Sequence, residues 1–334
     1  MGTRGKTDPF AVTLTRMGDG TSGRLGRADL VVSRLALGSW KTFEHLTKDE
    51  GLAVMRAARR LGVTFLDDAR YDDETGRAPI PTGYSEVLFG ELFRAAGWPR
   101  GDTVVANKLW WEFWPEQGAA RELDGSLGRM QFDYIDLIYA NPPPAGLEVA
   151  ALVDDVVGLV RAGKARAWGI VNWPAAQFSE AVEIAAQRGY PQPGAAQLPY
   201  SLVHRSVVED PAMATAIVAA GAGLVPSFVL AGGLLTGKYR GASGAGRMET
   251  ALSDPALKAA LDVADRLVEL AHELGQSPAS LAVAFAAAHP MTTSTLVGAT
   301  RPEQLEQSAA GVALASTLDD SALDRLRSLE PRPD

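Results

Sequence analysis

The chain has 334 residues, enough for one large domain or two of ordinary size. Its net charge of −8 argues against nucleic acid or an anionic membrane as the main partner, and the absence of cysteine excludes disulfides and cysteine-ligated metals. The four histidines lack the spacing of a metal motif, so we expect no bound metal. Because neither a membrane span nor a signal-peptide run is evident, we expect a cytoplasmic protein that acts on a small molecule.

The N-terminal segment is polar and rich in glycine, and we expect a flexible leader over residues 1–24. Gly18–Gly23 matches the G-x-G-x-x-G pattern of a dinucleotide-binding turn. No convincing strand precedes this pattern and no helix follows it, so it lacks the context in which such a turn binds phosphate. A glycine-rich loop is the simpler interpretation.

Short apolar runs alternate with amphipathic helices through the rest of the chain. We expect strands over 34–40, 63–67, 104–108, 134–139, 167–171, 195–198, 224–228 and 294–297. The clearest helices are expected over 47–62, 84–96, 117–130, 149–163 and 178–189. Thr47 and Glu50 form a capping box, Thr300 and Glu303 suggest another, and Ser277–Pro278 is typical of a helix start.

This alternation favours a single α/β domain of the TIM (β/α)₈ barrel class over residues 25–334. About eight strand–helix units fit the usual size of such a barrel. A doubly wound open sheet is the alternative, but no glycine-rich turn joins the first strand to its helix. No shift in composition marks a domain boundary.

In a barrel, the residues at the carboxyl ends of the strands converge on one mouth. The residues that this rule selects are Asp67, Lys108, Asn141, Asn172, Gln197, Ser227 and Phe228. Asp67 and Lys108 end apolar runs, where a charge must be paired or functional. Together with a tyrosine hydroxyl they would suit proton transfer to a carbonyl oxygen, with the lysine lowering the pKa of the tyrosine. A purely structural Asp–Lys pair explains the spacing equally well.

Eight segments in the same order resemble the aldo-keto reductase family. They cover most of the chain: 25–40, 62–71, 83–93, 106–111, 163–173, 195–205, 231–239 and 296–307. The resemblance implies a TIM barrel with an N-terminal hairpin cap that binds NADP(H) without a Rossmann motif. It also implies hydride transfer between nicotinamide and a carbonyl through an Asp–Tyr–Lys–His tetrad.

Asp67 and Lys108 match two members of that tetrad. The tyrosine has two candidates: Tyr71 stands one residue before the family's position, which Asp72 fills here, and Tyr84 lies after an apparent insertion at 72–83. We favour Tyr71 because it lies closer to the aspartate in sequence.

The histidine position is Asn141, which can donate a hydrogen bond to a carbonyl but cannot titrate. Carbonyl polarisation at this position therefore survives the replacement, whereas a proton relay through it does not.

The resemblance also assigns the cofactor site. Asn172 and Gln197 match the residues that hold the nicotinamide carboxamide, and the stacking aromatic is expected near Ser227, at Phe228. The residues that match the phosphate and adenosine contacts are Leu230, Gly232, Lys238, Gly298, Thr300, Arg301 and Gln304. Ser308, expected at the adenine, stands where the family usually has asparagine. Arg301 at a helix start favours NADP over NAD, although a well-capped helix start alone would explain Thr300–Gln304.

Aromatic residues gather near the expected mouth. Trp40 and Trp110 match substrate-pocket positions of the family, and Trp111 follows directly. These rings favour a flat or hydrophobic substrate, although core packing accounts for part of them.

Three functions fit these observations. The first is an NADPH-dependent oxidoreductase that reduces an aldehyde, a ketone or a related C=X bond with a tyrosine as general acid. The second is an isomerase, lyase or enoyl reductase on the same barrel, since the histidine is replaced and the tyrosine loop is remodelled. The third is an NADP-sensing binding protein, as in the potassium-channel β subunits that the family includes. Fold alone does not decide among them.

Overall fold

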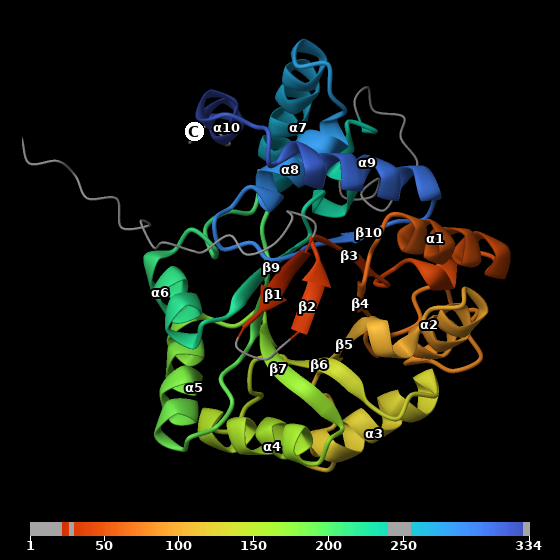
Figure 1. Ribbon diagram of the computed structural model, residues 1–334, viewed down its shortest axis with the longest axis vertical. Coiled ribbons are helices and arrows are strands. Elements are labelled where there is room, and N and C mark those ends of the chain that lie inside the picture. The colour runs from red at the N-terminus through yellow and green to blue at the C-terminus, as the bar shows by residue number, and fades with distance from the viewer. Residues whose placement is uncertain (1–21, 27–29, 240–254, 330–334) are drawn as a thin grey trace, which may run out of the picture.

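The computed structural model describes residues 22–26, 30–239 and 255–329, and these form a barrel of eight parallel strands surrounded by helices (Figure 1). Neighbouring strands follow the order β10-β3-β4-β5-β6-β7-β8-β9. Their bounds are β3 Leu35–Gly38, β4 Phe65–Asp67, β5 Val104–Leu109, β6 Ile135–Ala140, β7 Ala165–Val171, β8 Ala195–Pro199, β9 Gly223–Ser227 and β10 Thr295–Gly298. The TIM-barrel prediction is confirmed.

The barrel closes between its last two strands, β9 and β10. Leu224 accepts a backbone hydrogen bond from Thr293 at 2.8 Å and donates one to Met291 at 3.1 Å. On the other side, β10 pairs with β3 in parallel, with Thr295 opposite Leu35. The first and last strands of the barrel are therefore neighbours.

Helices cover the outside of the barrel (Figure 1). Their bounds are α1 Lys48–Arg60, α2 Tyr84–Ala95, α3 Ala119–Met130, α4 Val149–Arg161, α5 Ala175–Gln187, α6 Pro211–Ala220, α7 Pro255–Glu273, α8 Pro278–Ala287, α9 Pro302–Leu314 and α10 Asp320–Arg327. Short 3₁₀ helices occur at η1 Phe43–His45, η2 Arg100–Asp102 and η3 Ala231–Thr236. Over the described ranges, no helix combines the length and apolar character needed to cross a bilayer.

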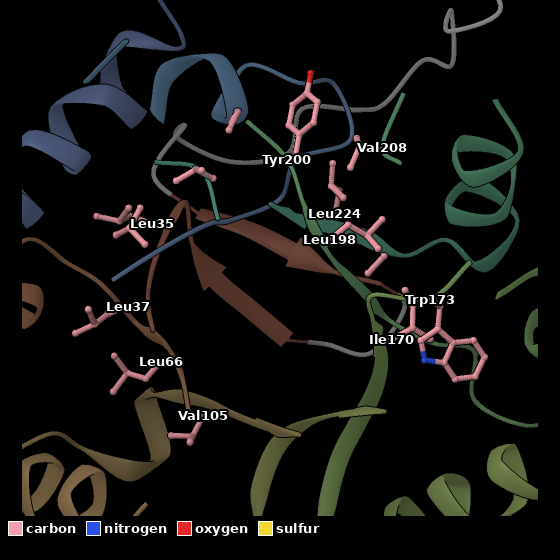
Figure 2. Close-up of a cluster of buried hydrophobic side chains, with 14 of the residues drawn as sticks. Leu35, Leu37, Leu66, Val105, Ile170, Trp173, Leu198, Tyr200, Val208 and Leu224 are labelled. Carbon is pink, nitrogen blue, oxygen red and sulfur yellow. The ribbon is translucent and has the colours of Figure 1, made fainter. Parts of the chain in front are cut away.

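Side chains of the strands alternate between two hydrophobic layers, as the pleat of a strand requires. Leu35, Leu37, Leu66 and Val105 point outward, toward the helices, and belong to the larger layer (Figure 2). The smaller layer fills the barrel interior and contains Ala36, Phe65, Val104, Ala106, Leu137, Tyr139, Ala167, Val171, Ala195 and Val225. The same alternation decides which polar side chains at the strand ends face the mouth.

An antiparallel hairpin, β1 Ser22–Leu25 and β2 Leu30–Ser33, covers one end of the barrel interior. Leu25, Leu30 and Val32 are fully buried and pack with the interior layer. Gly26 at the turn has φ +61°, and an added Cβ would lie 2.4 Å from the Gly194 Cα, so only glycine fits. The predicted hairpin cap is confirmed, and the polar site must lie at the other end.

Residues 1–21 of the predicted leader, with most of the Gly18–Gly23 pattern, lie outside the described residues. The leader prediction is wrong for residues 22–24, which belong to β1 and pair with β2.

Two of the three expected helix starts are correct. Thr47 and Glu50 form the reciprocal capping box of α1, and Ser277 caps α8 ahead of Pro278. The third differs, because the Gln304 Oε1 atom, rather than Glu303, accepts from the backbone N–H groups of Thr300 and Arg301.

Candidate active site

The centre of the site is a buried ion pair at the carboxyl ends of β4 and β5. Asp67 and Lys108 are 2% and 5% exposed, and the Lys108 Nζ atom contacts Asp67 Oδ1. The other carboxylate oxygen, Asp67 Oδ2, accepts a hydrogen bond of 2.8 Å from Gln197 Nε2 at the end of β8. Phe65, Ala106 and Ala195 face the interior two residues earlier on the same strands, so the pleat brings all three polar side chains inside.

Tyr71 is the tyrosine beside this ion pair. The Lys108 Nζ atom lies 3.2 Å from the Tyr71 hydroxyl oxygen. Tyr84 instead forms the first residue of α2, and no hydrogen bond or ring contact within the described residues joins it to Asp67 or Lys108. The structure therefore places Tyr71, and not Tyr84, with the pair.

The expected lowering of the tyrosine pKa is wrong for this structure. Burial foremost, and then the charges of Asp67 and Asp68, raise the pKa of Tyr71 well above its ordinary value. The charge of Lys108 is already balanced by Asp67, which explains why it does not dominate. Tyr71 consequently stays protonated at neutral pH.

The loop after Tyr71 folds back on itself. Asp72 and Thr82 form an antiparallel bridge, and the Gly83 N–H donates to the Tyr71 carbonyl at 2.8 Å. Inside the loop, the Asp73 carboxylate accepts from the Thr75 hydroxyl and from the backbone of Ala78, and mainly the Thr75 bond lowers its pKa to about 2. The apparent insertion is thus a structured turn whose two ends, Tyr71 and Gly83, lie side by side, and α2 begins directly after it.

Arg70 joins this loop to the segment after β5. Its Nη1 atom donates to the Thr82 hydroxyl at 3.1 Å, and its Nη2 atom pairs with Glu112. The guanidinium also lies over the Phe113 ring, 5.2 Å from its centroid. One buried arginine therefore holds two loops that flank Tyr71.

Asn141, at the replaced histidine position, directly follows β6. Its Nδ2 atom donates to the Leu109 carbonyl at 3.0 Å, and its backbone carbonyl accepts from the Trp111 indole at 3.0 Å. The Nδ2 bond holds the side chain, and the second bond holds the backbone, next to the end of β5, the strand that carries Lys108.

A cavity of about 400 Å³ opens beside Tyr71. Trp40 and Trp110 line it and are 44% and 37% exposed, and the Trp110 ring meets Tyr71 edge to face at 6.0 Å. Trp111 is only 2% exposed and belongs to the layer between strands and helices. Of the three predicted substrate-contacting rings, the structure therefore brings two to the cavity and packs the third in the core.

The residues expected around the nicotinamide lie at the ends of β7, β8 and β9. Asn172 is exposed and has φ +59°, a left-handed conformation that asparagine tolerates better than most residues. Gln197 is buried, with its amide nitrogen engaged by Asp67. Phe228 follows Ser227 directly, has φ +56°, and packs its ring against Trp40 at 6.4 Å.

The segment expected to bind the cofactor phosphates contains two successive glycines with positive φ, directly after Leu230 and Ala231. Gly232 and Gly233 have φ +68° and +93°, and a Cβ on Gly233 would lie 2.7 Å from the Lys238 Nζ atom. The exposed Lys238 side chain thus lies against the Gly233 backbone, where any other residue would carry a Cβ. A glycine turn beside a cation is a donor arrangement that suits phosphate.

The N-terminus of α9 forms the far end of the expected cofactor site. Thr300 and the exposed Arg301 precede the helix, after Gly298 at the end of β10. Gln304 is occupied in capping, and the Ser308 hydroxyl is buried and donates to the Gln304 carbonyl at 2.8 Å. Arg301 and Lys238 each supply an exposed cationic side chain that can bind a phosphate, whereas the N–H groups of Thr300 and Arg301 already donate to Gln304.

Sequence reasoning overlooked a second buried acid, Asp68. It accepts from the Ser39 hydroxyl, while its Oδ2 atom has no hydrogen-bond partner among the described residues. Burial and then the nearby charge of Glu86 raise its pKa well above the ordinary value. The signal was present, since a second carboxylate directly follows Asp67 at a strand end.

Glu122 was overlooked for a different reason, because it sits among polar residues of α3. Its carboxylate accepts from the backbone N–H groups of Trp110 and Trp111, at 2.6 and 3.2 Å. It thereby fixes the turn that presents Trp110 to the cavity. Burial raises its pKa despite these bonds.

Comparison with known proteins agrees with this geometry. The model described as "Aldo/keto reductase family" matches residues 34–331. The chain belongs to the aldo/keto reductase family.

Relatives within this family carry the name of a channel subunit. The chain is 32% identical to "Probable voltage-gated potassium channel subunit beta" of Oryza sativa subsp. japonica, over 91% of this chain and 95% of that protein. A protein of the same name from Arabidopsis thaliana is 29% identical over 91% and 95%. "Putative voltage-gated potassium channel subunit beta" of Schizosaccharomyces pombe is 27% identical over 90% and 91%.

Proposed function

We propose that this aldo/keto reductase is an NADPH-dependent oxidoreductase that reduces a carbonyl compound in the cavity beside Tyr71. The observation that carries the proposal is the chain of contacts from Asp67 through Lys108 to the Tyr71 hydroxyl, at the end of the barrel opposite the hairpin. A purely structural ion pair would not require a tyrosine hydroxyl at 3.2 Å from the lysine, on a residue that lines a cavity.

Tyr71, Lys108, Asp67 and Asn141 would each have a different role in proton transfer. Tyr71 starts protonated, because its pKa is raised, and donates its proton to the carbonyl oxygen as that oxygen gains charge. The phenolate that develops is stabilised by the Lys108 ammonium, and Asp67 keeps that ammonium in place. The Asn141 amide has a second N–H beyond the one given to Leu109, and this donor would orient the substrate oxygen.

The cofactor would be held at both ends of the mouth. Asn172 and Phe228 would contact the nicotinamide, while Lys238, Arg301 and the start of α9 would bind the phosphates. Bound NADPH supplies the hydride. Arg301 favours the phosphorylated dinucleotide, since its guanidinium can bind a phosphate through two parallel hydrogen bonds.

Lys108→Met tests the proposal. We expect NADPH consumption with an aromatic aldehyde, followed by the absorbance of reduced nicotinamide, to fall by a factor of about 100 or more. Removing one partner leaves Asp67 buried without its cation, which costs about 3–5 kcal/mol. The double variant Asp67→Asn/Lys108→Met restores charge balance and should fold, as thermal unfolding will show. Full turnover in the folded double variant would overturn the proposed mechanism.

A second candidate follows from the names of the relatives. A channel-subunit-like protein would bind NADPH and report its redox state to a partner, with little turnover. Tight NADPH binding measured by calorimetry, together with no oxidation of NADPH by a broad panel of aldehydes and ketones, would favour this candidate over the first.

A further inference from the structure

The residues that line the cavity beside Tyr71 include more carboxylates than cations. Its charged residues are Lys41, Glu44, Arg70, Asp72, Glu74 and Glu112. Both cations are already paired, Lys41 with Glu74 at 2.7 Å and Arg70 with Glu112. Glu44 and Asp72 have no ion-pair partner among the described residues, so their carboxylates give the wall a net negative charge.

Glu44 is held in a defined position. It lies in η1, and its Oε2 atom accepts the Thr42 N–H at 3.1 Å. Its charge reaches the reacting hydroxyl, since Glu44 is among the carboxylates that add to the effect of burial on the Tyr71 pKa. Asp72 directly follows Tyr71 and is exposed at the bridge with Thr82. The two acids come from different loops of the wall.

The apolar part of the same wall consists of the Trp40 and Trp110 rings. An aromatic face attracts a cation through its quadrupole, by about 0.5–1 kcal/mol at an exposed site. The Trp40 ring already lies beneath one ammonium, with Lys41 Nζ 5.0 Å from its centroid. Aromatic faces and unbalanced carboxylates around one cavity both favour the same chemistry, a cationic nitrogen on an apolar body.

We propose that this cavity selects carbonyl compounds that carry a cationic nitrogen, and that Glu44 and Asp72 are the residues that determine this selectivity. The carbonyl part of the statement rests on the proposed function, whereas the preference for a cation does not. Substrates with a carboxylate would meet repulsion from the wall, because its two cations are engaged.

Ligand binding tests the preference without any turnover. The probes are phenyltrimethylammonium, its neutral isostere tert-butylbenzene, and benzoate, with dissociation constants from tryptophan fluorescence or calorimetry. In Glu44→Gln/Asp72→Asn we expect binding of the cation to weaken about tenfold, from two partly screened charges. Binding of tert-butylbenzene should change less than about twofold. Glu180→Gln/Glu183→Gln, at two exposed positions on α5, removes the same two charges elsewhere and controls for net charge.

Turnover provides a second arm with NADPH and two aldehydes of equal shape, 4-(trimethylammonio)benzaldehyde and 4-tert-butylbenzaldehyde. The ratio of their kcat/KM values should fall about tenfold in the double variant, and the electronic difference between the aldehydes cancels in that comparison. If neither aldehyde is reduced, the proposed function fails while the binding arm still decides the selectivity. Tighter binding of benzoate than of the cation, or no larger effect than in Glu180→Gln/Glu183→Gln, would overturn the inference.

Discussion

At the scale of single residues, Asp67 organises the site by using each carboxylate oxygen for a different partner. Oδ1 holds the Lys108 ammonium and Oδ2 holds the Gln197 amide. A charge buried this deeply is tolerated only when its bonds are satisfied. These two bonds fix the Lys108 ammonium next to the Tyr71 hydroxyl and restrict the movement of the lysine side chain.

Tyr71→Phe and Tyr84→Phe form a matched pair of variants that tests whether Tyr71, and not Tyr84, is the proton donor. The first variant removes the hydroxyl 3.2 Å from Lys108 and should lower the rate of carbonyl reduction by about 100-fold or more, as expected for loss of a general acid. The second should keep nearly full activity, since Tyr84 lies at the start of α2. Steady-state kinetics with NADPH measures both, and equal loss in the two variants would contradict the assignment.

The approach of Asp67 to Lys108 could be predicted from sequence, because strand ends and strand alternation place both side chains at one mouth. The direction of the tyrosine pKa could not. It depends foremost on the burial of Tyr71, and then on the charges of Asp67 and Asp68, and the burial of a loop tyrosine is not evident from spacing in the chain. Closeness in sequence to Asp67 already favours Tyr71 over Tyr84, and the structure places Tyr71 beside Lys108.

At the scale of elements, α8 and α9 pack closely because of one glycine. A Cβ on Gly311 of α9 would lie 2.6 Å from the Ser280 carbonyl oxygen and 2.8 Å from the Val283 Cβ. Both neighbours belong to α8, and one of the clashes is with backbone, which cannot move aside cheaply. This contact therefore fixes the distance between α8 and the C-terminal half of α9.

Gly311→Ala should destabilise the protein by about 1–3 kcal/mol, since it overpacks the contact between two helices. Gly158→Ala on α4 is the control, because no atom lies within 4 Å of its added Cβ. That substitution should stabilise the protein by up to about 1 kcal/mol through helix propensity. Urea unfolding of both variants measures the difference, and the prediction is wrong if their shifts share the same sign.

Most elements followed from the sequence, since all eight barrel strands lie within a few residues of their expected positions. The helix α7 over Pro255–Glu273 was not predicted, although Pro255 at its first position and the left-handed Gly275 after its end are typical of helix boundaries. The capping residue of α9 was misplaced by one position, which shows that a Thr-x-x-Glu pattern does not decide between Glu303 and Gln304.

At the scale of the whole molecule, His289 lies at the seam where the barrel closes. Its Nδ1 atom accepts from the Met291 N–H at 3.4 Å, and Met291 in turn pairs with β9. Burial, assisted by Arg327, lowers the His289 pKa to about 4, against the opposing charge of Glu209. The folded protein therefore holds this imidazole in its neutral form.

The unfolded chain binds a proton at His289 with its ordinary pKa of about 6.5. The stabilising contribution is consequently complete above that pH and is lost as the pH falls toward about 4. Between about pH 7 and about pH 4.5, the free energy of unfolding should drop by about 1–3 kcal/mol more in the wild type than in His289→Gln. His45→Gln, at an exposed position in η1, should retain the wild-type drop in urea titrations at the two pH values.

The pairing of β10 with β3 has a consequence for biosynthesis. While a ribosome is still translating the middle of the chain, the nascent polypeptide has no partner for the outer edges of β3 and β9, and both edges stay open to other chains. Only when the segment through Gly298 has emerged can the cylinder be completed. Premature termination before Thr295 should thus yield a product that chaperones retain or that aggregates, rather than a smaller folded barrel.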